Sequence, residues 1–433
     1  MRNDSAPAVY GSNINGDICM TDTYFATCKI GLESVVAGEL RDLGIEVLRV
    51  SDARVDFAGD HFAMARACLW LRTAERVLMK LASFRAVTFD ELYEGVRRIR
   101  WKDYLLRTSF IHVNGKSAKS RLFSVSDCQS IAKKAIVDSL SREYGLKILP
   151  ENGRRIIIEI GILRDEVTVA LDCCGAGLSR RGYRTYNVPA PISETLGAAI
   201  VMLSGYRQTR PLIDPMCGSG TMPIEAAMIA NNIAPGINRE FAAEDWHFLQ
   251  NNAFVAAREQ ARDSVRRDTV DISGRDIDPH SIELCKKHAK KAGVMLDWLV
   301  EPVQKLRETR TGGVIVCNPP YGERLLEKQS AEELYRQMHG IFSQLDGWSV
   351  NIIASHPDFE RIYGARADKR RKLSNGGMTC TLYRYRPHYL SPKPERSNTD
   401  ESRTANRRMT GGFAWINHPA PGFNTSNFNA HSE

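Results

Sequence analysis

In the first part of the chain, apolar residues follow in turn the two-residue period of strands and the 3.6-residue period of helices. Residues 24–28 predict a strand, and apolar residues at helical spacing from Leu32 to Leu43 predict a helix. A second helix is predicted over 64–76, and a strand over 77–84 follows it. This part of the chain is therefore predicted to be α+β, and it carries no obvious catalytic group of residues.

A third helix and a hairpin complete this region. Ser126 and Gln129 have the spacing of a capping box, which predicts the start of a helix that ends at Gly145. The apolar segments 156–160 and 167–171 flank a short polar turn. Two such segments around a turn predict a β-hairpin.

From residue 192 onward, short apolar strands alternate with helices. This alternation is typical of a doubly wound parallel sheet. The segment 372–385 is predicted to close the sheet as an antiparallel hairpin, because Asn375-Gly376 marks a tight turn. The predicted parallel strands are 212–214, 271–276, 296–300, 314–318 and 350–355.

Composition sets limits on the class of protein. The chain has 433 residues, 43% of them hydrophobic, which suggests two or three domains and excludes general disorder. No apolar run approaches the ~18 residues that cross a bilayer. The net charge of +8 is only a mild bias towards polyanionic partners. The ten cysteines are scattered without a C-x-x-C pair, which predicts buried thiols, a cytoplasmic location and no metal site.

The segment 214–220, Asp-Pro-Met-Cys-Gly-Ser-Gly, lies where a strand is predicted to end and a helix to begin. Gly218 and Gly220 let the backbone approach a ligand closely, and Asp214 can accept hydrogen bonds from it. A dinucleotide enzyme would show a third glycine and an acid about 20 residues later. Here the third glycine is absent and the next acidic strand end is far downstream, which disfavours NAD. No phosphate-binding P-loop motif is present either.

A second acidic strand end follows at Asp276. This carboxylate is placed to accept hydrogen bonds from both hydroxyls of a ribose. Asp278 and Pro279 are a good N-cap and first residue for the next helix. A nucleoside cofactor lying across the strand ends would satisfy both acidic motifs.

The segment Asn318-Pro319-Pro320-Tyr321 ends the fourth predicted parallel strand. The prolines fix a stiff turn, which frees the Asn318 side chain and the Pro319 carbonyl from strand pairing. Both oxygens can accept hydrogen bonds from a planar –NH₂ group and leave the nitrogen lone pair aimed at an electrophile. Tyr321 offers a face on which an extruded base can stack.

These three motifs, in this order, resemble those of the Rossmann-like S-adenosylmethionine-dependent amino methyltransferases. Further segments resemble the bacterial 23S rRNA guanine-N2 methyltransferases, which carry a ferredoxin-like segment and a THUMP RNA-binding domain. The resemblance spans about residues 24–387. These segments are 25–33, 67–70, 135–138, 178–184, 190–195, 318–325 and 366–369.

The resemblance implies an α/β fold, with a seven-stranded, mostly parallel class I methyltransferase sheet after an α+β ferredoxin-like and THUMP region. It divides the chain into a flexible N-terminus, a ferredoxin-like segment, a THUMP domain, a methyltransferase domain and a disordered tail. These parts are expected at 1–22, 23–62, 63–175, 186–388 and 389–433, respectively.

The resemblance also implies roles for particular residues. S-adenosylmethionine would be held at its methionine end by the glycine turn, at its ribose by Asp276 and at its adenine by Ile277. Where relatives commonly place an Asp near the adenine amine, this chain has Glu301. The segment 318–321 would position the guanine amine, with Asn318 also close to the cofactor. The turn residues with this implied role are Asp214, Pro215, Cys217, Gly218, Ser219 and Gly220.

Basic clusters with nearby aromatic residues are candidate RNA contacts, with solvated charged faces as the alternative. The implied partner is 23S rRNA or an assembly intermediate of the large subunit, with no membrane and no metal. The candidates are Lys116, Lys119, Arg121, Lys133, Lys134, Arg180, Arg181, Arg184, Lys369, Arg370, Arg371 and Lys372.

Other functions stay open. The N-P-P-Y motif also serves enzymes that methylate adenine N6 in RNA or DNA, and enzymes that methylate a glutamine side-chain amide. A non-catalytic RNA-binding or ribosome-assembly protein is the alternative from another class. The motif does not by itself distinguish guanine from adenine.

Overall fold

The computed structural model describes residues 22–184, 192–249, 252–322 and 325–389, together with the backbone of 10–12 and 18–20. These residues belong to one compact unit, residues 1–394. The backbone at the start forms a short antiparallel hairpin of β1 (Tyr10–Ser12) and β2 (Ile18–Met20), within the segment predicted to be flexible. Of the predicted tail, residues 390–433 lie outside the described residues.

The first half of the chain forms a seven-stranded sheet in the order β4-β5-β3-β6-β9-β8-β7. The long strand β6 pairs with β3 at its start and with β9 at its end, so the segments predicted to be ferredoxin-like and THUMP share one sheet. Only β7 and β8 run parallel. The strands are β3 (Asp22–Cys28), β4 (Glu46–Ser51), β5 (Arg54–Gly59), β6 (Ala74–Arg85), β7 (Phe110–Ala118), β8 (Arg155–Leu163) and β9 (Glu166–Asp172).

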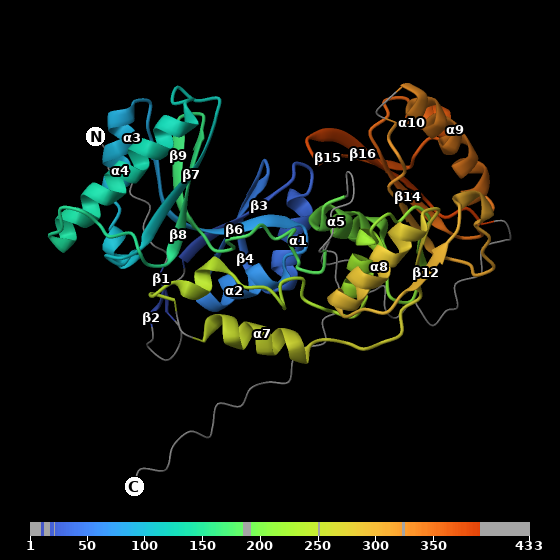
Figure 1. Ribbon diagram of the computed structural model, residues 1–433, viewed down its shortest axis with the longest axis horizontal. Coiled ribbons are helices and arrows are strands. Elements are labelled where there is room, and N and C mark those ends of the chain that lie inside the picture. Colours follow the sequence, from blue (N-terminus) through green and yellow to red (C-terminus); the bar gives the residue numbers. More distant parts are fainter. Residues whose placement is uncertain are drawn as a thin grey trace, which may run out of the picture. The chain divides into compact units, whose positions relative to one another are not determined.

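Four α-helices accompany this sheet: α1 (Glu33–Asp42), α2 (His61–Trp70), α3 (Phe89–Arg97) and α4 (Val125–Tyr144). α3 and α4 pack together beside strands β7 to β9 (Figure 1). A short 3-10 helix, η1 (Trp101–Asp103), follows α3. The α+β organisation predicted for this region is confirmed.

The predicted helix over 64–76 is wrong over its last six residues, 71–76. α2 ends at Trp70, and Leu71 takes an extended conformation with φ −64° and ψ 112°. The backbone N–H groups of Arg72 and Thr73 donate to the buried carboxylate of Glu39 in α1, at 2.7 and 3.2 Å. This tertiary acceptor replaces the helical carbonyls, which local propensity could not reveal.

The predicted capping box of the third helix is also wrong. α4 has Ser124 as its N-cap, and the Gln129 amide instead donates to the Val113 carbonyl of β7 at 3.1 Å. The helix does end at Gly145, which takes the left-handed φ of 64°. The β8–β9 hairpin is confirmed, with Arg164 and Asp165 both at positive φ, as a tight hairpin turn requires.

The second half forms a seven-stranded sheet in the order β12-β11-β10-β13-β14-β16-β15. The first five strands in this order are parallel and β16 is antiparallel to both of its neighbours, so the predicted doubly wound sheet with a closing hairpin is confirmed. The strands are β10 (Leu212–Asp214), β11 (Ile272–Asp276), β12 (Asp297–Val300), β13 (Val314–Cys317), β14 (Ser349–Ala354), β15 (Lys369–Asn375) and β16 (Met378–Tyr385).

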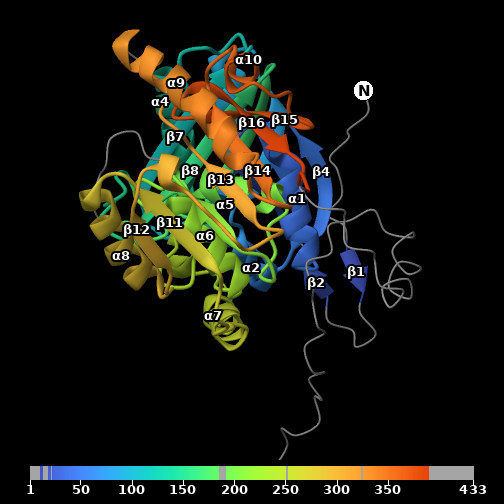
Figure 2. The same ribbon diagram turned by 90° about the vertical axis from the view of Figure 1, so that its right-hand side faces the viewer.

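Helices cover both faces of this sheet (Figure 2). Side chains alternate along the central strands: Leu212 and Val314 join the core beneath α5, α6 and α8, whereas Ile213 and Ile315 join the core beneath α9 and α10. The helices are α5 (Glu194–Ser204), α6 (Thr221–Ala230), α7 (Ala253–Asp263), α8 (Pro279–Ala292), α9 (Leu325–Phe342) and α10 (Phe359–Tyr363), with 3-10 turns η2 (Ala242–Asp245) and η3 (Val303–Lys305).

The closing hairpin is longer than predicted. β15 begins at Lys369 rather than at residue 372, because residues 369–372 pair in register with β16. The basic run therefore lies inside a strand, where successive side chains point to opposite faces. The nine cysteines whose side chains the structure describes are free and buried, as predicted. No described helix is long and apolar enough to cross a membrane.

Candidate active site

Three polar strand ends meet at one edge of the second sheet. Asp214 of β10 is level with Gly274 of β11, and β13, the other neighbour of β10, runs in the same direction and ends at Cys317. Asp276 ends β11 beside β10, and Asn318 directly follows β13. Because the carboxyl ends of parallel strands share an edge, the structure brings the three predicted motifs together.

The glycine turn between β10 and α6 bends back onto β11. Gly218 has φ 52° and Gly220 has φ 82°, both in the left-handed region that favours glycine. The Gly218 N–H donates to a carboxylate oxygen of Asp276 at 2.9 Å. A Cβ at Gly220 would lie 2.8 Å from the Trp298 ring, whereas one at Gly218 would meet nothing within 4 Å. Gly220 is therefore needed for packing, and the space at Gly218 is open.

Asp214 is almost fully buried, with 1% of its surface exposed. One carboxylate oxygen accepts from the Met216 N–H at 3.2 Å, and the other has no hydrogen-bond partner. Burial, with a smaller contribution from the negative charge of Asp276, raises the pKa of Asp214 well above its ordinary value. An unpaired, buried carboxylate fits a cationic group such as the ammonium of a methionine moiety.

Two side chains of α8, Cys285 and His288, contact the backbone of the glycine turn. The Cys285 thiol contacts the Gly218 carbonyl at 3.1 Å, and its sulfur lies 3.8 Å from that of Cys217. Nδ1 of His288 lies 3.1 Å from the Ser219 carbonyl, and burial lowers the pKa of this histidine, which favours a neutral ring. Neither Cys285 nor His288 carries a local sequence signal for this role.

The carboxylates of Asp276 and Asp278, at and after the end of β11, have different hydrogen-bond partners. Asp278 caps α8 by accepting from the N–H groups of His280 and Ser281 at 3.0 and 3.1 Å, so its predicted capping role is confirmed. Hydrogen bonding, chiefly from the Ser281 hydroxyl, lowers the pKa of Asp278. Asp276 is held differently, by the N–H groups of Gly218 and Asp278. Its orientation is therefore fixed next to the glycine turn.

The two candidate adenine contacts, Ile277 and Glu301, differ in whether their side chains already have partners in the protein. The side chain of Ile277 is 72% exposed and open to a flat ring. The Glu301 backbone N–H donates to the Asp276 carbonyl at 2.9 Å, and its carboxylate pairs with the Arg275 guanidinium. The charge of Glu301 is thus already compensated within the protein.

The N-P-P-Y turn is fixed by hydroxyl groups. The Tyr321 hydroxyl donates to the Asn318 side-chain oxygen at 2.7 Å, and the Tyr335 hydroxyl of α9 donates to the Pro320 carbonyl at 2.6 Å. Asn375, in the β15–β16 hairpin, reaches the Tyr321 oxygen at 3.5 Å. An amide oxygen has two lone pairs, so Asn318 keeps one for a substrate amine.

This arrangement adds to what the sequence predicted for Tyr321. The ring is partly buried against the core, and burial raises the pKa of its hydroxyl well above the ordinary value, so the hydroxyl remains a donor. The sequence suggested a stacking face but gave no sign of the bond to Asn318. Tyr335 could not be found from the sequence, because it lies 15 residues away on another element.

Each of the three predicted basic clusters contains exposed side chains, and among the arginines at 180–184 only Arg180 is exposed. Lys116, Lys119, Arg121 and Lys134 are exposed, whereas Lys133 pairs with Glu151 at 3.1 Å. In the hairpin cluster, Lys369, Arg370 and Lys372 are exposed and Arg371 is partly buried.

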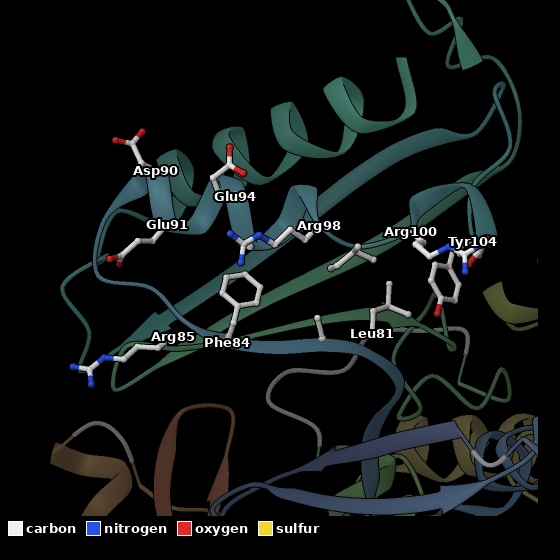
Figure 3. A pocket seen from close by; sticks show the side chains of 13 residues that line it. Leu81, Phe84, Arg85, Asp90, Glu91, Glu94, Arg98, Arg100 and Tyr104 are labelled. Carbon is white, nitrogen blue, oxygen red and sulfur yellow. Dashed lines mark hydrogen bonds and ion pairs between the residues drawn. The ribbon is translucent and has the colours of Figure 1, made fainter. Parts of the chain in front are cut away.

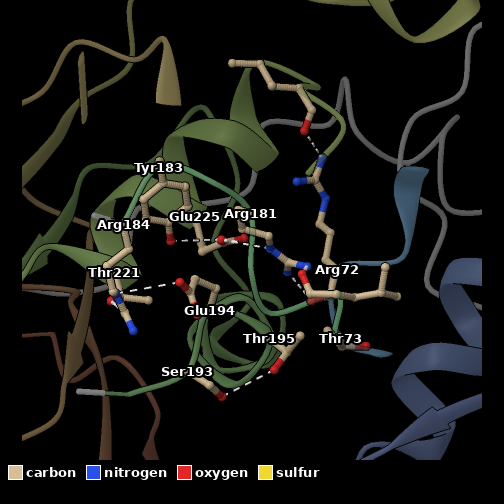
Figure 4. A network of polar contacts seen from close by, with 12 residues as sticks. Arg72, Thr73, Arg181, Tyr183, Arg184, Ser193, Glu194, Thr195, Thr221 and Glu225 are labelled. Atoms are coloured by element: carbon tan, nitrogen blue, oxygen red, sulfur yellow. Dashed lines mark hydrogen bonds and ion pairs between the residues drawn. The ribbon is translucent and has the colours of Figure 1, made fainter. Parts of the chain in front are cut away.

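The third cluster requires a correction. Arg181 has a side chain only 2% exposed, which pairs with the fully buried Glu225 at 3.3 Å and donates to the Arg72 carbonyl (Figure 4). Arg184 pairs with Glu194 at 3.6 Å and donates to the Thr221 hydroxyl. The prediction that Arg181 contacts RNA is wrong for this structure. The Arg184 guanidinium already has Glu194 and Thr221 as partners. The pattern of charges in the sequence does not show that Arg181 and Arg184 form ion pairs with buried carboxylates.

A groove of about 790 Å³ lies away from the strand ends, between β6 and α3 (Figure 3). Phe84 and Arg85 line it from the strand, Glu94 lines it from the helix, and Arg98 lines it from the residue after the helix. Acidic and basic side chains are mixed along its walls. In the described ranges, no three His, Cys, Asp or Glu side chains gather in a way that could hold a metal ion.

Known families match successive parts of the chain: the RlmL ferredoxin-like domain over 23–78, the THUMP domain over 86–172, and the RMKL-like methyltransferase domain over 181–384. Over 385 residues the chain is 42% identical to YpsC of Bacillus subtilis, named as an RNA methyltransferase, covering 88% of this chain and 99% of YpsC. The chain belongs to the RlmL-like family.

Solved structures agree with this family. A predicted N6-adenine-specific DNA methylase from Listeria monocytogenes is 43% identical, with a TM-score of 0.81 over 85% of this chain and 97% of that protein. SMU.472, named as a methyltransferase and solved with S-adenosylhomocysteine, is 40% identical, with a TM-score of 0.80 over 86% and 99% of the two chains. This RlmL-like protein is therefore an S-adenosylmethionine-dependent nucleic-acid methyltransferase.

Proposed function

We propose that this protein transfers a methyl group from S-adenosylmethionine to the exocyclic N2 amine of a guanosine in 23S rRNA. The observation that carries the proposal is the position of Asn318, held by the Tyr321 hydroxyl, at the sheet edge where Asp214 and Asp276 also end their strands. The THUMP match supports RNA as the substrate.

The proposed cofactor site follows from the partners that each group lacks. Asp214 supplies an unpaired buried oxygen for the methionine ammonium, Asp276 faces the ribose, and Ile277 offers an open apolar surface to the adenine. Pro215, Cys217, Gly218, Ser219 and Gly220 shape the turn around the methionine end. Glu301, paired with Arg275, acts on the adenine through its backbone position. S-adenosylmethionine supplies the electrophilic methyl group when it is bound.

The protein's part in the transfer is alignment. The Asn318 side-chain oxygen and the Pro319 carbonyl each accept one hydrogen from the guanine amine, so its lone pair is directed at the methyl group. The C–S bond breaks as the N–C bond forms, and the nitrogen then releases one proton to solvent. Pro320 and Tyr321 keep the turn rigid, and the Tyr321 ring is the proposed stacking surface for the extruded base.

Nucleoside analysis tests this proposal. The protein is incubated with labelled S-adenosylmethionine and unmodified rRNA, and the RNA is digested to nucleosides. We expect label in N2-methylguanosine, and about 100-fold less with Asn318→Ala because the amine is no longer aligned. Label only in N6-methyladenosine, or none in RNA, would overturn the proposal.

Adenine N6 is the second candidate target. It is favoured by the Listeria relative, which is described as a predicted N6-adenine-specific DNA methylase. The same two acceptors would hold an adenine amine equally well, so the digestion assay decides between the bases. A non-catalytic assembly role would instead leave a cellular phenotype intact in the Asn318→Ala strain.

A further inference from the structure

The basic run of the closing hairpin is divided between two faces of the sheet. In β15, Lys369 and Arg371 point to one face, and Arg370 and Lys372 to the other, because side chains alternate along a strand. Arg384 of β16 lies directly opposite Lys369 in the register and therefore shares its face. We call Lys369, Arg371 and Arg384 the inner basic face.

The inner basic face and the N-P-P-Y turn are linked along one face of β15, with the buried Leu373 between Arg371 and Asn375. Asn375 lies at the end of β15 on this same face, and its amide reaches the Tyr321 oxygen at 3.5 Å. Tyr321 in turn donates to Asn318 at 2.7 Å. Arg371 is four residues before Asn375, which is about 14 Å along a strand. A short segment of single-stranded RNA can span that distance.

The charges on this face are not neutralised by the protein. Within the described part of the chain, no carboxylate lies within ion-pair distance of Lys369, Arg371 or Arg384. The pKa of Arg384 is lowered by burial and by the neighbouring charge of Arg371, so these cations repel each other. On the opposite face, Arg370 is already paired with Glu360 at 2.8 Å.

The neighbouring helix adds to the positive potential. Arg371 donates to the hydroxyl of Ser34 in the first turn of α1, and β15 and α1 lie side by side (Figure 2). The positive end of the helix dipole is at this terminus. Glu33, the nearest acid of that turn, is engaged by the backbone N–H groups of Gly31 and Ala53. The face is thus suited to an anion that comes from outside.

We infer that the inner basic face binds the phosphates of the RNA strand next to the target nucleotide, whereas Arg370 and Lys372 do not contact RNA. The inference rests on the proposed function, because it takes the base at Asn318 to belong to an RNA strand. It also gives different roles to the four consecutive basic residues 369–372: Lys369 and Arg371 bind phosphates, whereas Arg370 and Lys372 do not. This difference follows from the alternation of side chains along β15, which the structure shows to begin at Lys369.

Two double variants with the same loss of charge test the inference. Arg371→Gln with Arg384→Gln removes two cations of the inner face, and Arg370→Gln with Lys372→Gln removes two from the opposite face. Binding of an unmodified 23S rRNA transcript is measured without cofactor between 50 and 200 mM salt. Binding of S-adenosylhomocysteine to each variant controls for folding, and Arg371→Gln alone replaces the first pair if that pair fails to fold.

The inner-face pair should flatten the dependence of log K on log salt by about 1.4 to 1.8, from about 0.7 to 0.9 per lost phosphate contact. The opposite pair should keep the wild-type slope and an affinity within about threefold. Equal losses in both pairs, or no loss in either, would overturn the inference and leave the proposed function standing. A wild-type protein that does not bind the transcript would overturn both.

Discussion

Replacing Asp214 by Asn should stabilise the cofactor-free protein and weaken cofactor binding at the same time. The substitution keeps the shape of the side chain and removes its negative charge. In the structure, that charge is buried, one oxygen has no partner, and the pKa is raised by burial. The carboxylate is therefore poorly accommodated until a cation reaches it.

The magnitudes follow from these contacts. A buried group without a partner costs about 1–3 kcal/mol, and more when it is charged, so removing the charge with Asp214→Asn should raise the free energy of unfolding by about 1–3 kcal/mol at pH 8. A hydrogen bond to a charged group contributes about 1.5–3 kcal/mol, so the variant should bind S-adenosylhomocysteine about 10- to 150-fold more weakly. The first quantity is measured by urea unfolding and the second by calorimetric titration.

The pH dependence has a definite sign. Because the folded-state pKa of Asp214 lies above its unfolded value, the cofactor-free protein loses stability as pH rises from the unfolded pKa through the folded one. Over the same range the carboxylate ionises, so affinity for the ammonium-bearing ligand should rise. Asp214→Asn should remove this group's contribution to both trends.

Asp276→Asn is the matched control, because the Asp276 carboxylate already accepts two backbone N–H groups, at 2.9 and 3.0 Å. It should weaken ligand binding with no gain in stability. An Asp214→Asn protein that binds the ligand as tightly as wild type, or that unfolds more easily, would refute the reasoning.

Three further predictions concern the supports of the site. Tyr321→Phe keeps the ring and loses the bond to the catalytic amide, so kcat should fall about 2- to 12-fold while S-adenosylhomocysteine affinity is unchanged; an unaltered single-turnover rate would contradict this. Arg181→Met should cost about 3–5 kcal/mol in urea unfolding by leaving Glu225 unpaired, and adding Glu225→Leu should recover most of it. Gly274→Ala places a Cβ 2.3 Å from an indole ring and should cost about 1–3 kcal/mol, whereas Gly161→Ala, with open space, should not; equal melting curves would count against the packing argument.

Local sequence patterns were sufficient where the cause of a structure is local. Gly145 ends α4 because glycine tolerates a positive φ, and Asp278 caps α8 through the next two N–H groups along the chain. The predicted helix end at 76 failed because Glu39, more than 30 residues away, captures the backbone after α2. The donors and the acceptor of that contact come from different elements, so no local pattern contains it.

The sequence by itself determined the strands of the second sheet and their order along the chain, the three motifs and the family resemblance, because each depends on residue type and spacing. It did not predict β4, β5 and β7 of the first sheet. Tertiary structure alone decided which cations are free: Arg181 is buried against Glu225, and the hairpin run is divided by strand alternation. It also supplied the hydroxyl contacts of Tyr321 and Tyr335 to the catalytic turn. Contacts between residues that come together only when the chain folds depend on packing and strand register. The pattern of charges along the sequence contains neither.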